Sequence, residues 1–463
     1  MTVTQDFLLR KRGLLAFALL SPGAARAHAS EQGFVLLLPT DVYIAAGSAS
    51  VAATVVLLAL LPEAWLARAF APLRMGRGRR DGWALATSWA GFAVLMALLW
   101  AGVAGARDPL ANPLPLAVWT VWWIAFTAVV GLVGDIWAWV NPWRGPVLMM
   151  RALGLRTSWH LSRRVAPWVA LAGFLAFTGF LLADPAPFDP ARLARVAGLY
   201  WLAAFLGALA FGPRFLLRGE PFGVFFRAYG QLGLIARGRI GLWGWQILRA
   251  PAPPLGLALF LVAMLGSGSF DGLNETFWWL ARIGINPLEF PGRSVVIVPS
   301  LAGLLAANLA LALAFALVVR AGIALAGGGM GWAEGFCRFA PALLPIALGY
   351  HVAHYLTALL VDGQYALIAA SDPFARGWDL LGLGRFQVTT GFFNTQDSVR
   401  AIFLTQAGAV VAGHMLSIVL AHAIAARQFP TRRRAVLSQL PVAAFMVAYT
   451  LFGLWLLASP RGA

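Results

Sequence analysis

Histidines are the side chains of this chain best suited to chemistry, and four of the six lie in two long apolar segments. His351 and His354 are three residues apart, so a helix carries both imidazoles on one face. His414 and His422 lie in the next apolar segment. Because an ionisable side chain is costly inside a bilayer, its presence there points to function.

Three of these imidazoles can share one depth. At a rise of about 1.5 Å per residue, His351 lies roughly 15 Å and His354 roughly 10 Å below the outer end of their segment. The next segment runs the opposite way and carries His414 roughly 20 Å below its outer end. We predict that the three imidazoles converge if the two segments pack together.

Three carboxylates, Asp271, Glu275 and Asp362, lie at the predicted outer mouth of the same region. Asp271 and Glu275 are four residues apart, and Asp362 returns to nearly the helix face of His351. A carboxylate in this position can act as a further metal ligand, orient a histidine, or serve as a general base. These three acids are therefore the predicted catalytic residues.

Nitrogen and oxygen ligands without thiolate suit a divalent transition metal such as Zn, Cu, Mn or Fe. Three protein ligands with an open position would lower the pKa of a bound water toward about 7. The single cysteine, Cys337, excludes a disulfide framework and a cysteine-rich metal site. Three other interpretations stay open: histidines that bridge helices, a proton or substrate pathway without metal, and a haem held by His351 and His414.

The N-terminal residues 1–29 read as an export signal. Basic residues at 10–12 precede an apolar run that is too short to span a bilayer, and small residues follow it. Cleavage is expected after Ala29 or after Ala27. Cleavage after Ala27 would make His28 the N-terminal residue of the mature chain, where its amine and imidazole could chelate copper.

The composition excludes a soluble enzyme, a disordered protein and a coiled coil. Of 463 residues, 60% are apolar and 11% are charged. A soluble domain carries about 45–50% apolar and about 25% charged residues. We predict an all-α, polytopic membrane protein in which residues 30–463 form a single membrane domain.

Ten apolar segments are long enough to cross a bilayer. They are 42–61, 83–104, 116–139, 165–183, 193–212, 254–270, 294–319, 339–361, 401–426 and 436–458. With both ends outside after signal cleavage, arginine outnumbers acidic residues in every inner loop, as the positive-inside rule requires. The long inner loops 145–164 and 219–249 read as amphipathic helices lying in the interface.

The net charge of +17 is therefore a signal of topology and lipid contact, and no nucleic-acid partner is expected. The predicted location is the bacterial inner membrane. The expected partners are the bilayer and either a lipophilic small molecule or a metal ion.

Several strings together resemble a known family. They are Ala27–Ala29, Leu36–Pro39, Asn141–Arg144, Phe211–Phe222, Tyr350–Tyr355, Ser371–Phe374, Gly377–Asp379, and His414 to His422 followed by Arg432–Arg434. The chain is similar over nearly its whole mature length to bacterial integral membrane proteins of the fenitrothion hydrolase-like family. The resemblance implies hydrolysis of an aryl phosphotriester and an oligomer of related chains, and it assigns no catalytic residues.

The function expected from these observations is a membrane-embedded, metal-dependent hydrolase. Its site would hold His351, His354 and His414 with the nearby carboxylates, and would open to the periplasm. One alternative is a periplasm-facing protein that binds or transports copper, with His28 at its N-terminus. Another is a structural or assembly subunit without catalysis.

Overall fold

The computed structural model describes residues 35–76, 81–155, 157, 159–286 and 292–461. Within this part of the chain the fold is all-α, with ten helices or helical runs long and apolar enough to cross a membrane. This confirms the predicted all-α class, and ten such helices support a multi-pass membrane protein. The ten comprise α3 (Thr40–Leu60), α5 (Asp81–Ala104), the run Pro113–Val133, α10 (Ala166–Ala183), α11 (Pro190–Phe211), α14 (Leu255–Asn274), α16 (Ile297–Leu325), α18 (Leu344–Ser371), α19 (Gln396–Gln428) and α20 (Arg432–Ala458).

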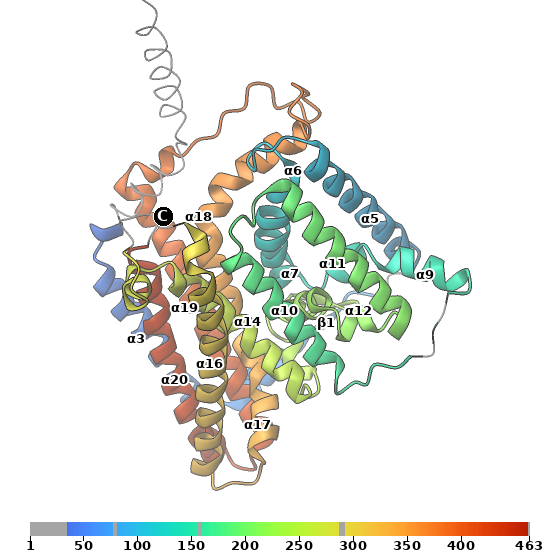
Figure 1. Cartoon of the computed structure of the whole chain (residues 1–463). Helices are drawn as coiled ribbons and strands as arrows, with labels where there is room; N and C mark the ends of the chain where they lie inside the picture. Colours follow the sequence, from blue (N-terminus) through green and yellow to red (C-terminus); the bar gives the residue numbers. More distant parts are fainter. Residues whose placement is uncertain (1–34, 77–80, 156, 158, 287–291, 462–463) are drawn as a thin grey trace, which may run out of the picture.

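Short elements connect these helices. They include α4 (Glu63–Ala69), α8 (Trp137–Val140), α9 (Arg144–Ala152), α12 (Phe215–Arg218), α13 (Pro221–Gly230), α15 (Phe277–Arg282) and α17 (Trp332–Phe339). Strands β1 (Leu73–Arg74), β2 (Ile235–Ala236) and β3 (Arg239–Ile240) form a small antiparallel sheet in the order β1-β3-β2. Figure 1 shows α3, α16, α19 and α20 gathered on one side of the bundle and α5, α9 and α11 on the other.

Helices α18 and α19 pack closely through glycines. A Cβ atom on Gly349 would lie 2.5 Å from the carbonyl oxygen of Ala409, and one on Gly413 would lie 2.5 Å from that of Pro345. Small residues allow helix backbones to approach in this way, where lipid offers no hydrophobic driving force for association. The two glycines therefore set which face of α18 meets α19.

The third span is irregular. It consists of α6 (Pro113–Pro115), the π-helical η1 (Leu116–Phe126) and α7 (Thr127–Val133). It ends at Gly134, whose positive φ of 143° is a conformation that glycine adopts readily. Because π-helical turns often mark functional sites, the backbone around Trp123 is of interest.

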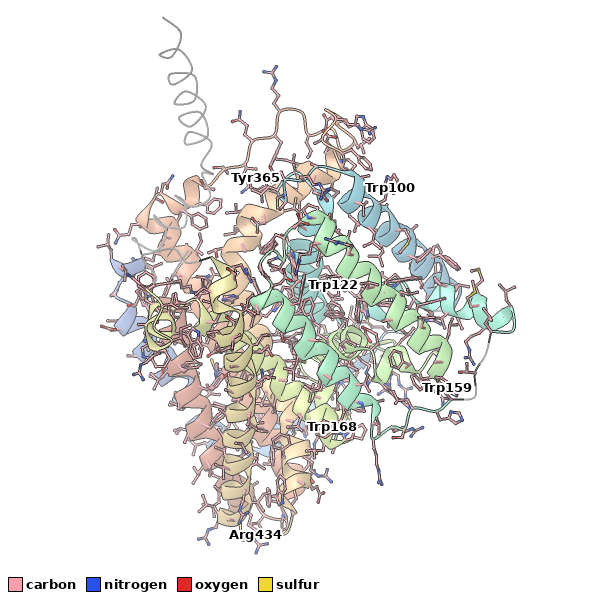
Figure 2. The ribbon with its side chains drawn as sticks, viewed as in Figure 1. Trp100, Trp122, Trp159, Trp168, Tyr365 and Arg434 are labelled. Atoms are coloured by element: carbon pink, nitrogen blue, oxygen red, sulfur yellow. The ribbon has the colours of Figure 1, made fainter. Side chains whose placement is uncertain are left out.

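The prediction of an interfacial helix within 219–249 is wrong for α13. Every residue of α13 except Arg227 is buried. The reason is that its aromatic side chains pack inside the bundle: the ring of Phe222 lies 4.5 Å from that of Trp122, and Phe226 lies 5.3 Å from the same ring. Figure 2 shows Trp122 within the bundle, whereas Trp100 and Trp159 lie at its margin.

Candidate functional site

A narrow pocket with a cavity volume of about 20 Å³ lies among η1, α10, α13, α14 and α18. Its wall combines aromatic and aliphatic side chains with several polar groups. The polar lining comprises Thr178, Tyr229, Ser267, Asp271, Tyr350, His351, His354 and Tyr355. Such a mixture of apolar wall and convergent polar groups is typical of small-molecule sites.

Asp271 and His354 form the centre of this polar group. The Nε2 atom of His354 lies 3.1 Å from Oδ2 of Asp271, and the hydroxyl of Tyr355 donates to the same carboxylate oxygen. Asp271 comes from the last turn of α14, and the other two come from α18. Both side chains of this contact are largely buried, with 11–12% of each exposed. Burial of a carboxylate is tolerated here because two donors face it.

The C-terminal residues return to this site. The backbone N–H of Phe277 donates to the carbonyl of Pro460 at 3.0 Å, and Thr276 pairs with Arg461 in an antiparallel bridge. The Nη1 atom of Arg461 then lies 3.4 Å from Nδ1 of His354 and 3.9 Å from a carboxylate oxygen of Glu275. A guanidinium therefore covers the second nitrogen of the His354 ring.

His351 is held by the irregular third span. Its Nε2 atom lies 2.8 Å from the carbonyl oxygen of Trp123, so this nitrogen carries the proton and donates it. The rings of Trp123 and Tyr355 meet the imidazole edge-on, at 5.1 and 4.9 Å between centroids. In its neutral form the ring then presents Nδ1 as an acceptor.

His414 does not join the other two imidazoles. It is fully buried, its Nδ1 atom lies 2.9 Å from the carbonyl of Val410 in its own helix, and it does not line the pocket. Its ring neighbours are Tyr350 and Tyr449, at 6.1 and 6.3 Å. Because the Gly349 face of α18 meets α19, the face carrying His351 and His354 turns away toward η1 and α14.

The predicted convergence of three imidazoles is therefore not what the structure contains. Among the described residues, no three His, Cys, Asp or Glu side chains lie close enough together to hold a metal ion. Asp362 lies on α18 about 12 Å further along the helix than His354, and it does not line the pocket. His28 lies outside the described residues.

No family model, curated protein or solved structure matches this chain.

Residue patterns alone missed three groups at this site. Tyr355 directly follows His354, and its position in the same apolar helix was the available signal. Arg461 follows the last span at the predicted outer end, and only the pairing with Thr276 brings it to the pocket. Arg293, at the start of the seventh span, lies within electrostatic range of Asp271 and Glu275.

This arrangement can move a proton. A carboxylate fixes one nitrogen of His354, so the other nitrogen can accept a proton from water once Arg461 moves aside. The cation of Arg461 can stabilise negative charge on a bound molecule. The aromatic wall can hold an apolar group beside both.

Proposed function

We propose that this chain hydrolyses a lipophilic aryl phosphotriester at a membrane-embedded site. His354 is the general base in this proposal, and Asp271 is the positioning residue that orients it. The observation that carries the proposal is the contact of 3.1 Å between Nε2 of His354 and the carboxylate of Asp271 at the wall of an apolar pocket. The resemblance to fenitrothion hydrolase-like proteins supports the choice of substrate class.

The reaction divides into a proton transfer and a displacement at phosphorus. Nδ1 of His354 takes a proton from water while the water oxygen forms a bond to phosphorus. The bond from phosphorus to the aryl oxygen breaks, and the aryl oxide leaves with the electron pair. Asp271 accepts the Nε2–H of the resulting imidazolium and stabilises its positive charge.

Arg461 supplies the stabilising charge in this scheme. Its guanidinium lies near both His354 and Glu275 in the absence of substrate. A phosphoryl oxygen is a strong acceptor for a guanidinium, so the substrate would draw Arg461 away from Nδ1 of His354. Substrate binding would thereby expose the base.

The apolar wall suits the remainder of the substrate. Trp123, Phe225 and Tyr229 present aromatic faces and edges to the pocket, and Met264 adds an adaptable apolar surface. A lipophilic triester would concentrate in the bilayer and reach the site from there. The aryl ring would pack against these side chains, with its phosphoryl group toward His354.

A second candidate is a metal-dependent form of the same site. His351 and His354 both direct Nε2 to an oxygen, as metal-binding histidines commonly do through the nitrogen that is not a ligand. Their two Nδ1 atoms would be the protein ligands of a divalent ion such as Zn or Cu, and no third His, Cys, Asp or Glu side chain of the described residues lies close enough to join them. Arg461 would have to leave, because its charge repels a cation.

The test uses the full chain purified in detergent and a triester with a nitrophenol leaving group. We expect turnover by the native chain, and a fall in kcat of about 10²–10⁴-fold in His354→Gln. His160→Gln is the matched control, because His160 is exposed and remote in sequence from the site. Native turnover in His354→Gln would overturn the proposal.

Metal content separates the two candidates. Elemental analysis of the purified chain would show a stoichiometric metal that is lost in His351→Ala if the second candidate is right. If the first is right, turnover survives chelation, and Arg461→Gln lowers kcat more than Arg461→Lys does, because lysine keeps the charge.

A further inference from the structure

A second pocket lies at the arginine-rich end of the bundle. Its cavity volume is about 70 Å³. Its walls are the segment before α14, the end of α17 with the 3₁₀ turn that follows it, and the C-terminal end of α19. The lining comprises Ile247, Leu248, Ala250, Pro251, Ala252, Pro253, Arg338, Pro341, Ile424, Arg427 and Gln428.

Two arginines supply the charge of this pocket. Arg427 is exposed, donates to the carbonyl of Leu248, and has no carboxylate within 4.0 Å in the described part of the chain. Arg338 pairs at 2.8 Å with Glu334, whose side chain is 52% exposed and solvated. The prolines of the wall have no N–H to donate, so its side-chain donors are the two guanidinium groups and the amide of Gln428.

Apart from Gln428, the rest of the lining is apolar. Ile247, Leu248 and Ile424 lie beside the two arginines. A ligand that matches this wall has an anionic group and an adjoining hydrocarbon portion. Two guanidinium groups suit a phosphate, because each presents a fork of N–H donors to its oxygens.

The location of the pocket agrees with such a ligand. Arg434, in the first turn of α20, and Tyr365, near the end of α18, lie at opposite ends of the bundle (Figure 2). Arg427 lies near Arg434 along the chain, and both belong to loops that the positive-inside rule predicts to be cytoplasmic. Anionic lipids of the cytoplasmic leaflet bind basic pockets between helices on this side.

We propose that this pocket binds the phosphate headgroup of an anionic phospholipid between Arg338 and Arg427, with the start of an acyl chain against Ile424 and Leu248. The site is independent of the proposed hydrolase site, because it shares no lining residue with that pocket.

The test compares lipids on the delipidated full chain in detergent. Phosphatidylglycerol, phosphatidylcholine and inorganic phosphate are titrated separately, and binding is followed by native mass spectrometry and by the shift in Tm. We expect saturable binding of phosphatidylglycerol, and about 10–30-fold weaker binding in the double variant R338Q/R427Q, at about 1 kcal/mol per arginine.

Two controls make the result decisive. Arg427→Lys keeps the charge and one donor for the carbonyl of Leu248, so it should retain most of the affinity even if Arg427→Gln folds poorly. Arg320→Gln removes an exposed arginine that does not line the pocket and should bind like the native chain. An equal loss of affinity in Arg320→Gln would overturn the proposal, as would full stabilisation by inorganic phosphate with none by phosphatidylglycerol.

Discussion

Asp271 is a buried carboxylate that two neighbouring side chains stabilise. Its two partners, His354 and Tyr355, both reach the same oxygen, Oδ2. Removing the negative charge while keeping the size of the side chain leaves the histidine in place but changes which ring nitrogen holds the proton. The function of His354 should therefore depend on Asp271 more than the fold does.

We predict that Asp271→Asn lowers kcat for triester hydrolysis by about 10³–10⁴-fold, because the amide no longer stabilises the imidazolium. Asp362→Asn should leave kcat near the native value, since Asp362 does not line the pocket. The measurement is kcat for both variants at matched protein folding, judged by Tm. A greater loss of kcat in Asp362→Asn than in Asp271→Asn would contradict the assignment of His354 as the base and Asp271 as its positioning residue.

Glu220 is a buried carboxyl residue at the N-terminus of α13. It is 1% exposed and caps α13, where its carboxylate accepts from the backbone N–H groups of Phe222 and Gly223 and from the hydroxyl of Tyr200. Burial raises the pKa of Glu220 to about 7, although these hydrogen bonds oppose the rise. The native state therefore binds a proton more readily than the unfolded chain does.

The expected consequence is a pH-dependent stability. A carboxyl whose folded pKa exceeds its unfolded value near 4.5 stabilises the fold most below that value, and the contribution is lost as pH rises toward about 7. Between pH 4.5 and pH 7, the native chain should lose about 3 kcal/mol more of its free energy of unfolding than Glu220→Gln does. Tm measured from pH 4.5 to pH 8 checks this. A native chain that gains stability over Glu220→Gln as pH rises would contradict it.

The packing of α18 against α19 determines which side chains of α18 face the pocket. Gly413 allows the carbonyl of Pro345 to approach, whereas Gly408, on the same helix, has nothing within 4 Å of its Cβ position. This contact fixes the rotation of α18 about its axis. Because the glycine face of α18 packs against α19, His354 lies on the side of the helix that faces Asp271.

We predict that Gly413→Val destabilises the protein by about 1–3 kcal/mol, because the added methyl groups overlap backbone atoms of α18. Gly408→Val is the control on the same helix and should change stability little, since its side chain enters open space. Tm in detergent gives the comparison. Equal effects of the two substitutions would show that the α18–α19 contact is not tight.

The distribution of arginines along the chain predicts the orientation of the whole protein across the membrane. The ten long apolar helices fit a multi-pass membrane protein, and the proposed catalytic pocket lies toward the end that the sequence predicts to face outward. An outward-facing site would meet substrates arriving from the periplasm or the outer leaflet. The lipid pocket would face the opposite leaflet.

Cysteine labelling tests this orientation. With Cys337→Ser as background, we expect a membrane-impermeant maleimide to label Leu381→Cys in spheroplasts and to leave Leu155→Cys unlabelled. Both leucines are more than half exposed, at 53% and 57%, so accessibility in the fold is matched. Labelling of both after membrane disruption is the control. The reverse pattern in spheroplasts would invert the predicted topology.

The all-α class and the positions of the long helices could be predicted from the amino-acid sequence alone. In a bilayer each segment must satisfy its backbone hydrogen bonds internally, so a long apolar run predicts a helix without reference to the rest of the chain. The same reasoning identified Asp271 and His354 as candidates, since ionisable residues in apolar helices are few.

Which of these side chains contact one another could be seen only in the folded chain. It paired His354 with Asp271, turned His351 toward the carbonyl of Trp123, and left His414 against its own helix. It also brought Arg461 back over the site. These outcomes depend on how each helix is rotated about its axis and on where the chain returns. Contacts between distant segments set both, and no local pattern encodes them.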